Sequence, residues 1–305
     1  MKVIGITGGT GFIGHHLVKL LTENNFYVVI FSRNKKEKNN KDNVTYAYWD
    51  PAREECDLPA LQKLDAIVHL AGAGVADKRW TDERKKEIVD SRVKTTAFII
   101  GMLQKHAPNC KTFIGASATG WYGPDRPDTA PFEESTPSYK DFLGNTCRLW
   151  EEEEGKAAVF SRLVILRFGI VLGKESGAFP KFAQPTSFGV LPILASGKQV
   201  ISWIHVDDLC SMILYTLNNT GIKGIYNAVA PKPVTDAQLM ATIARVKGGL
   251  KIPVHVPAFV LKAMLGEMSI EVLKSCTVSA KKITASGFSF QYADIESAVK
   301  DILSR

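Results

Sequence analysis

The sequence predicts an α/β fold: a doubly wound parallel sheet with a smaller C-terminal lobe. Three observations carry this prediction. Short apolar runs alternate with helix-like stretches, the first apolar run leads into a glycine-rich turn, and further strand-like runs recur at 27–31, 66–74, 112–123 and 162–173. Because strands that alternate with helices form parallel sheets covered on both faces, this order favours a Rossmann domain.

Residues 3–17, VIGITGGTGFIGHHL, contain the most informative motif. An apolar strand-like run precedes the turn, and apolar residues at helical spacing follow from Phe12. The turn fits both GxGxxG and GxxGxxG, through Gly8, Gly9, Gly11 and Gly14. Glycines allow a tight strand-to-helix turn and let a pyrophosphate approach the N–H groups that open the helix. We therefore predict dinucleotide binding here rather than a merely structural turn.

The second strand-like run ends at Ser32-Arg33. NAD-specific sites usually place an acidic residue there, which accepts hydrogen bonds from the ribose 2′-hydroxyl, whereas an arginine suits a 2′-phosphate. Lys35 and Lys36 would add positive charge. The sequence therefore favours NADP(H) as the cofactor. The alternative is that Arg33 points into solvent.

Composition excludes several function classes. The chain of 305 residues is 45% hydrophobic and 23% charged, with no run of 18 apolar residues, so no membrane span or membrane partner is expected. Its start does not resemble a signal peptide, and its five scattered cysteines lack a CxxC pair, which indicates a reducing, cytoplasmic compartment.

The net charge of +7 is dispersed apart from RNKKEKNNK at 33–41, so we expect no nucleic-acid partner. Oligomeric state stays open, a homo-oligomer included.

The strand pattern assigns the domains, because no low-complexity linker divides the chain. Residues 1–173 are predicted to form the dinucleotide-binding domain, with a return strand and helix near 203–230. The smaller substrate lobe takes most of 174–305. Within this lobe, 174–204 is expected to be a loop or hairpin that lines a cleft. Helices are expected at 81–103, 235–245, 253–268 and 293–303.

The run His205-Val206-Asp207-Asp208 raises the question of a metal site. Apolar residues follow it at helical spacing, so an aspartate here is expected to cap a helix and complement its dipole. We therefore predict a helix start at this point and no metal.

Four motifs, in order, carry a family resemblance: TGGTGFIG (7–14), HLAG (69–72), SATGWYG (117–123) and SWIHVDDL (202–209). The chain resembles the extended short-chain dehydrogenase/reductase superfamily, in its NAD(P)-dependent epimerase/dehydratase branch. Within that branch it is similar to an atypical subfamily labelled "epimerase family protein", or sugar nucleotide epimerase-like. The supporting stretches are DFLGNTCRLWE (141–151), VPAFVLKAMLGEM (256–268) and GFSFQYADIESAVKDIL (287–303).

The resemblance implies a set of cofactor ligands. The glycines and the start of the first helix would hold the pyrophosphate, Ser32 and Arg33 the ribose phosphate, and Val171 the nicotinamide end. Arg92 stands where the superfamily usually has an asparagine, and it is either a cation near the cofactor or a surface arginine. The implied ligands are Gly8, Gly11, Phe12, Ile13, Gly14, Ser32, Arg33, Leu70, Ala71, Gly72, Arg92 and Val171.

The expected catalytic residues depart from the superfamily. It uses a Ser or Thr with a Tyr-x-x-x-Lys pair, in which the lysine lowers the pKa of the tyrosine so that it can act as a base. Here Leu143 and Cys147 stand at the Tyr and Lys places. Candidate proton carriers are Tyr122, Tyr139, Asp141 and Cys147, each with a structural alternative: packing under a loop for Tyr122, a helix cap for Asp141 and a buried small residue for Cys147. The predicted catalytic residues are Ser117, Thr119 and Tyr122.

A second departure concerns the substrate. The arginine that such enzymes commonly carry just before IHV, directed at a sugar nucleotide's diphosphate, is replaced by Ser202 and Trp203. Either Lys198 contacts the diphosphate or the substrate is not a nucleotide sugar.

Two functions are compatible with the sequence. The first is an NADP(H)-dependent oxidoreductase or epimerase acting on an unidentified carbonyl or carbinol, with a sugar-derived substrate among the options. The second is a catalytically weak NADP(H)-binding, redox-sensing module that acts through a protein partner. The retained Ser-Ala-Thr motif favours the enzyme.

Overall fold

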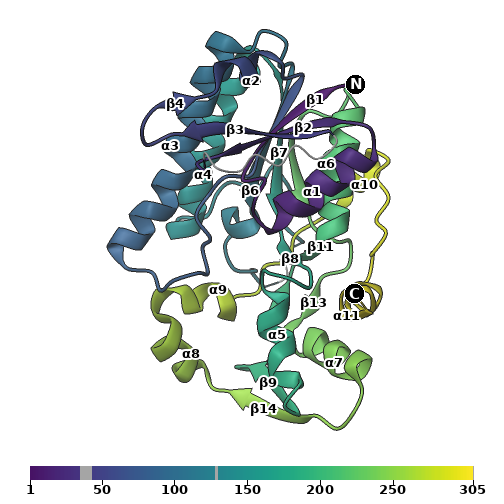
Figure 1. Ribbon diagram of the computed structural model, residues 1–305. Coiled ribbons are helices and arrows are strands. Elements are labelled where there is room, and N and C mark those ends of the chain that lie inside the picture. The colour runs from purple at the N-terminus through teal and green to yellow at the C-terminus, as the bar shows by residue number, and fades with distance from the viewer. Residues whose placement is uncertain (35–42, 128–129, 305) are drawn as a thin grey trace.

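The computed structural model describes residues 1–34, 43–127 and 130–304 (Figure 1). Its main sheet has eight strands in the order β12-β7-β6-β5-β1-β2-β3-β4. All neighbouring strands are parallel except β3 and β4. The strands are β1 (Val3–Thr7), β2 (Tyr27–Ser32), β3 (Val44–Asp50), β4 (Glu55–Cys56), β5 (Ala66–His69), β6 (Thr112–Ala118), β7 (Arg162–Phe168) and β12 (Gly224–Ala228). The predicted doubly wound parallel sheet is confirmed.

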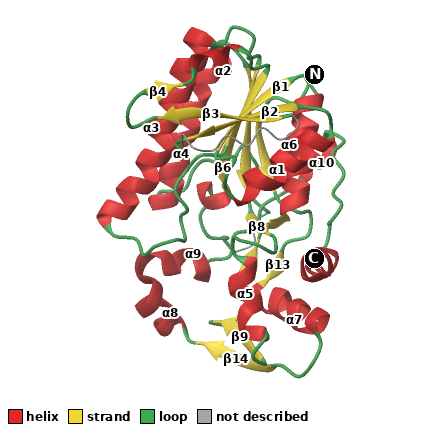
Figure 2. Cartoon of the chain, viewed as in Figure 1, coloured by secondary structure: helices red, strands yellow, loops and turns green. Residues whose placement is uncertain are grey.

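Helices cover both faces of this sheet, as Figures 1 and 2 show. One face carries α1 (Phe12–Glu23), α6 (Val206–Asn218) and α10 (Lys281–Ala285), and the other α2 (Leu58–Gln62), α3 (Asp82–His106) and α4 (Phe142–Gly155). Short 3-10 turns follow β6 and α4, namely η1 (Thr119–Trp121) and η2 (Lys156–Val159).

Alternate residues of the buried strands supply the two cores. In β2, Val28 and Ile30 belong to the cluster under α1 and α6, whereas Val29 and Phe31 belong to the cluster under α2 and α3. Successive side chains of a strand point to opposite faces, so a strand that is buried on both faces is apolar throughout.

The remaining elements form a smaller lobe, which lies below the main sheet in Figure 1, where β7 leads into β8 (Ile170–Leu172). β8 pairs with β11 (Trp203–His205), β10 (Val200–Ile201) with β13 (Val234–Thr235), and β9 (Val190–Leu194) with β14 (Ile252–Val256). Its helices are α5 (Phe179–Thr186), α7 (Asp236–Lys247), α8 (Ala258–Leu265), α9 (Ser269–Leu273) and α11 (Ile295–Ser304), with a 3-10 turn η3 (Gly266–Met268). A separate apolar cluster, which includes Phe179, Trp203, Leu239 and Val299, fills this lobe.

Two expectations for the lobe were wrong. Residues 174–204, expected to be a loop or hairpin, contain the helix α5 as well as strands. The helix expected at 253–268 begins only at Ala258, because the preceding residues form β14. Pro253 and Pro257 explain the second error: a residue before proline is pushed out of the helical region.

The helix starts expected near residues 81 and 235 are confirmed. The side chains of Thr81 and Asp141 cap α3 and α4, and Thr235 forms a capping box with Gln238 at α7. No helix within the described ranges is long and apolar enough to cross a lipid bilayer.

Candidate cofactor and active site

The candidate site lies at the carboxyl edge of the main sheet, where the strand order changes direction. From β1 the chain winds outward through β2 and β3, and then returns to β5 on the other side of β1. In open α/β sheets, the crevice at such a point is where ligands bind. Gly8, which opens the turn after β1, has φ +72 and lies so close to the loop after β5 that a Cβ atom would approach Leu70 C to 2.9 Å. Only glycine fits this position without strain.

The start of α1 is shaped for an anion. A Cβ atom on Gly14 would overlap the carbonyl oxygen of Gly8, so the two glycines let the helix begin directly on the turn. α1 has no side-chain cap and no acidic residue in its first turn, whereas α3, α4 and α7 are capped by side-chain oxygens. Its first N–H groups and its positive dipole end are therefore available to a phosphate. This arrangement fits the pyrophosphate of a dinucleotide.

Other predicted cofactor ligands gather at the same edge. Leu70, Ala71 and Gly72 directly follow β5. Val171 lies in β8, and its carbonyl oxygen and the Phe12 ring both lie against Gly177. Residue Ile13 opens α1 beside Phe12.

The end of β2 presents the residues expected to recognise the ribose phosphate. The Ser32 hydroxyl accepts a hydrogen bond from the Asn34 N–H at 3.1 Å, and the Arg33 side chain is exposed. Lys35 and Lys36 lie outside the described residues. Arg33 thus follows β2 directly with an exposed side chain, and its contact with a 2′-phosphate stays a prediction.

Arg92 reaches the cofactor loop from α3. Its Nη1 donates to the carbonyl oxygens of Ala73 and Ile88, both at 3.0 Å, and its guanidinium lies 5.0 Å from the Trp150 ring centre. Burial lowers the pKa of Arg92, with the neighbouring Cys147 thiol acting in the opposite sense. Arg92 is therefore a half-buried cation whose guanidinium is held against the loop at Gly72, and its contact with a cofactor stays a prediction.

Ser117 is turned into the protein interior. It is buried, and its hydroxyl donates to Glu151 at 2.6 Å. Arg167 binds both carboxylate oxygens of Glu151 at 2.8 Å and donates to the Tyr122 hydroxyl at 2.9 Å. Tyr122 in turn donates to Asn227 at 2.7 Å. This buried network joins β6, α4, β7 and β12 across one end of the sheet.

The network encloses Ser117 and Tyr122. Tyr122 is fully buried, and burial raises its pKa to about 12. A proton carrier must come within hydrogen-bond reach of the substrate, and both hydroxyls are instead engaged inside the fold. Both hydroxyls are thus placed to support the site, and their catalytic role stays a prediction.

Thr119 differs from Ser117 and Tyr122 in its surroundings. It is the first residue of η1, directly after β6, and it is half-buried. Its hydroxyl donates no hydrogen bond to another residue of the described ranges. Of the three predicted catalytic residues, Thr119 alone could offer a free hydroxyl to a substrate.

The four candidate proton carriers differ in burial and in hydrogen bonding. Asp141 caps α4, where its carboxylate accepts from the Gly144 N–H at 2.7 Å. Burial raises the pKa of the Cys147 thiol to about 12, which suits a small buried residue. Tyr139 is exposed and packs against Gly123, next to η1. With Tyr122 enclosed, Tyr139 is the candidate whose phenol can meet a substrate.

Leu143 and Cys147 occupy the helix face that meets the end of β6. A Cβ atom on Gly120 would lie 3.2 Å from Leu143 Cβ and 3.8 Å from Cys147 Sγ. The usual Tyr and Lys places are therefore filled by these two residues, which hold no charge and no free hydroxyl.

Sequence reasoning missed Glu151, Arg167, Asn227 and Glu154. The available signal was Arg167 itself, a charge near the end of the apolar strand RLVILRF, since buried charges need partners. Glu154 is fully buried against Gly115 of β6, and no described group donates a hydrogen bond to either carboxylate oxygen. Burial raises the pKa of Glu154 well above its usual value.

Glu154→Gln is expected to stabilise the protein at neutral and alkaline pH. Because the folded-state pKa is raised, the folded protein holds a proton that the unfolded chain releases above about pH 4.5. Parent stability should therefore fall as pH rises from about 4.5 through the folded-state pKa, and the variant should lack this slope. We expect a gain of about 1–3 kcal/mol at pH 8 that shrinks toward pH 5, measured by urea unfolding. Glu153→Gln, at a neighbouring position on α4, is the control. An equal pH slope in parent and Glu154→Gln would contradict the assignment.

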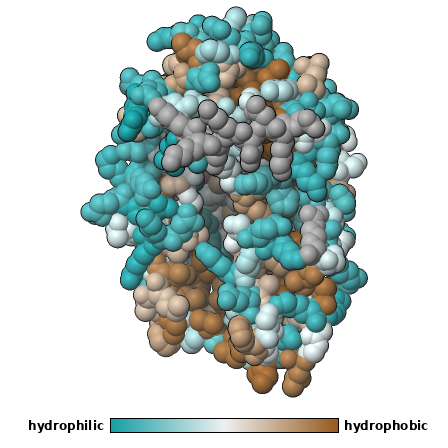
Figure 3. Space-filling view, viewed as in Figure 1, coloured by the Kyte–Doolittle hydropathy of each residue, from teal (hydrophilic) through white to brown (hydrophobic). Residues whose placement is uncertain are grey.

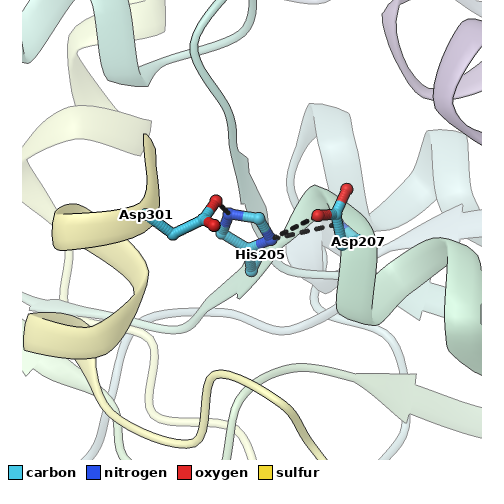
Figure 4. Close-up of side chains that lie close together, drawn as sticks. All are labelled: His205, Asp207 and Asp301. Atoms are coloured by element: carbon cyan, nitrogen blue, oxygen red, sulfur yellow. Dashed lines mark hydrogen bonds and ion pairs between the residues drawn. The ribbon is translucent and has the colours of Figure 1, made fainter. Parts of the chain in front are cut away.

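The described residues include one group with metal-ligand chemistry, His205, Asp207 and Asp301 (Figure 4). The two carboxylates approach opposite nitrogens of the ring: Asp301 lies 3.3 Å from Nε2 and Asp207 3.9 Å from Nδ1. Nδ1 also accepts the Asp207 N–H at 3.1 Å. Because ligands of one ion must converge on one point, this arrangement fits a helix start tied to α11 better than a metal site.

The helix cap itself differs from the expectation. His205, not an aspartate, caps α6, and Asp208 instead accepts the N–H groups of Gln291 and Tyr292. Asp207 and Asp208 still place negative charge in the first turn, where it complements the helix dipole.

Comparison with known proteins agrees with this geometry. The model of the NAD dependent epimerase/dehydratase family matches residues 4–228, and a domain of unknown function (DUF1731) matches residues 256–302. The epimerase family protein YfhF of Bacillus subtilis is 41% identical over 99% of this chain and 98% of its own length.

Solved structures are similar over the whole chain. The human epimerase family protein SDR39U1, solved with NADPH, has a TM-score of 0.83 and 26% identity over 99% of both chains. A nucleoside-diphosphate sugar epimerase from Corynebacterium glutamicum has a TM-score of 0.78 and 28% identity, covering 99% of this chain and 58% of its own. With the family model matching most of the chain, this protein belongs to the NAD-dependent epimerase/dehydratase family, within the extended short-chain dehydrogenase/reductases.

Proposed function

We propose that the protein is an NADP(H)-dependent oxidoreductase or epimerase that acts on a carbonyl or carbinol substrate. The observation that carries the proposal is the uncapped, acid-free start of α1 at the switch point, with the exposed Arg33 at the end of β2. The NADPH in the similar human structure supports the phosphorylated cofactor.

Each group would have a distinct task in this reaction. The bound nicotinamide supplies or accepts a hydride. The turn from Gly8 to Gly14 would hold the pyrophosphate, Ser32 and Arg33 the ribose phosphate, and Leu70 to Gly72 and Val171 the remaining length of the cofactor. Arg92 would place positive charge under the loop at Gly72.

Thr119 and Tyr139 are our candidates to meet the reacting oxygen. The Thr119 hydroxyl would donate a hydrogen bond to it, and the exposed Tyr139 phenol would carry the proton. The cation of the usual lysine is absent from position 147, so the Tyr139 phenol lacks that source of activation. We therefore expect a slow enzyme.

The substrate is proposed not to be a nucleotide sugar. Ser202 is buried and its hydroxyl donates to the Cys276 carbonyl at 2.8 Å, while the buried Trp203 donates to Lys232 O at 3.0 Å. Both side chains at the usual diphosphate-binding place are thus engaged inside the lobe. Lys198 is exposed. If the substrate were a nucleotide sugar after all, Lys198 would be the residue that contacts its diphosphate.

Other expectations from the sequence stay proposals. We keep the assignment of 1–173 with 203–230 to cofactor binding and most of 174–305 to the substrate. The five cysteines, all free thiols, support a reducing cytoplasmic compartment. A homo-oligomer is compatible with this function.

The alternative function is an NADP(H)-binding, redox-sensing module. It is favoured by the inward-facing hydroxyls of Ser117 and Tyr122, which leave few groups for chemistry. Oxidation of bound NADPH by any member of a panel of aldehydes and ketones, lost in Thr119→Val, would support the enzyme. Tight binding with no oxidation would support the module.

Fluorescence titration with NADPH and NADH tests the cofactor assignment. The parent should bind NADPH more tightly, because the guanidinium of Arg33 pairs with the 2′-phosphate. Arg33→Met should weaken NADPH binding about tenfold or more and leave NADH binding unchanged. Arg148→Met, on the exposed face of α4, is the matched control and should change neither. Equal affinity of the parent for both cofactors would refute the preference, and binding of neither would refute the site.

A further inference from the structure

The far end of the C-terminal lobe carries an exposed apolar surface. We call it the apolar tip and define it as Phe188, Val190, Leu250, Ile252 and Val254. Phe188 is 79% exposed, Leu250 87% and Ile252 63%. Figure 3 shows apolar side chains gathered at the lower end of the molecule, where Figure 1 places β9 and β14.

The apolar tip is a single structural unit. Phe188 and Leu250 lie in two turns, each beside a glycine with positive φ, Gly189 and Gly249. The Ile252 N–H donates to the Gly189 carbonyl at 2.9 Å, which holds the two turns together. The strands behind them pair in parallel, with Ile252 opposite Val190. The most exposed side chains therefore project from turns at the end of a small ribbon.

Lysines flank the two turns. The Lys247 ammonium donates to the Ser187 hydroxyl at 2.7 Å, next to Phe188, and the Lys251 ammonium donates to the Gly248 carbonyl at 2.8 Å, next to Leu250. Both lysines thus have long stems beside apolar side chains, with the charge at the rim.

The surrounding segments contain no acidic residue. Neither 176–206 nor 237–266 has an Asp or Glu, while together they hold Lys181, Lys198, Arg245, Lys247, Lys251 and Lys262. Of these, Arg245 is paired with Glu296 of α11. Lys181 donates to the Ala76 carbonyl, so the cations placed beside the exposed apolar side chains are Lys247 and Lys251.

We propose that the apolar tip docks on an anionic phospholipid surface, with Phe188 and Leu250 inserted among the lipids and the lysines at the headgroups. Such a surface has the complementary charge, and it accommodates side chains that project from turns without a matching shape. A second copy of this chain would bring lysines against lysines, and a protein partner would need fitted pockets for two separate turns. This contact adds to the proposed cofactor function and revises the expectation that no membrane is a partner.

Vesicle flotation with the full chain tests this proposal. The parent should float with vesicles of phosphatidylcholine and phosphatidylglycerol in equal parts, much less with phosphatidylcholine alone, and less at high salt. Phe188→Ser with Leu250→Ser should lower the partition coefficient about tenfold or more, through lost apolar burial. Lys251→Glu should lower it on the anionic vesicles only.

Val159→Ser is the matched control, since Val159 is 81% exposed on η2 in the dinucleotide-binding part. It should float like the parent. NADPH affinity, measured on every variant, shows that the fold and the cofactor site are intact. Loss of vesicle binding with unchanged NADPH affinity would therefore concern the apolar tip alone, whereas loss of NADPH binding would concern the cofactor assignment.

Three results would overturn the proposal. The first is a parent protein that floats with neither kind of vesicle. The second is a double serine variant that floats like the parent. A concentration-dependent dimer by light scattering, lost in the double variant without any vesicle binding, would assign the tip to a second copy instead.

Discussion

Arg167→Met is expected to lower the free energy of unfolding by about 3–5 kcal/mol. Arg167 and Glu151 are both buried, and the guanidinium binds both carboxylate oxygens at 2.8 Å. Removal of the arginine leaves the Glu151 carboxyl in the interior, either charged or newly protonated. Its remaining hydrogen-bond donor is the Ser117 hydroxyl. Urea unfolding at pH 7 measures the loss.

The control for this prediction is an ion pair on α4, the helix that carries Glu151. Arg148→Met breaks the ion pair with Glu152, which is exposed on both sides, and it should cost about 1 kcal/mol or less. Arg167→Met combined with Glu151→Leu should recover part of the loss, because it removes the unpaired charge. Equal losses for Arg167→Met and Arg148→Met would show that the buried pair is not a structural element of the fold.

Gly14→Ala is expected to weaken NADPH binding about tenfold or more and to lower the free energy of unfolding by about 1–3 kcal/mol. The added methyl group would overlap the carbonyl oxygen of Gly8 and the backbone of Gly9. These are backbone atoms, so α1 itself must shift away from the turn that receives the pyrophosphate. Fluorescence titration and urea unfolding measure the two effects.

Gly101→Ala is the matched control for this second change. Gly101 lies within α3, and a Cβ atom there meets nothing within 4 Å. It should raise stability by about 0.5–1 kcal/mol, the helix preference of alanine over glycine, and leave NADPH affinity unchanged. An unchanged NADPH affinity in Gly14→Ala would contradict the role of this turn in cofactor binding.

Features encoded within a few residues were predictable. The glycine turn, the helix starts near 81 and 235, the cap offered as an alternative for Asp141 and the return strand β12 depend on neighbours in the sequence, and the structure has them where expected. The exceptions are local as well: prolines within an apolar run hid β14 and delayed α8. A periodic pattern alone does not distinguish a short strand from a helix turn when proline interrupts it.

The orientation of polar side chains at the site was not predictable. Ser117 and Thr119 are two residues apart in one motif, yet Ser117 faces α4 and is enclosed, whereas Thr119 begins η1 and is half-buried. The face on which each lies depends on where β6 ends and η1 begins. That boundary is set by packing against α4 and cannot be derived from residue type.

The sequence by itself determined the doubly wound sheet, the glycine turn that opens α1 and the arginine at the end of β2, because strand periodicity, turn chemistry and helix starts are local properties. Only the tertiary structure decided that the hydroxyls of Ser117 and Tyr122 are enclosed, that Arg92 is a half-buried cation at the loop after β5, and that Glu151, Arg167 and Asn227 form one network. Those outcomes depend on groups far apart in the chain that share one buried space, where each polar atom must find its partner.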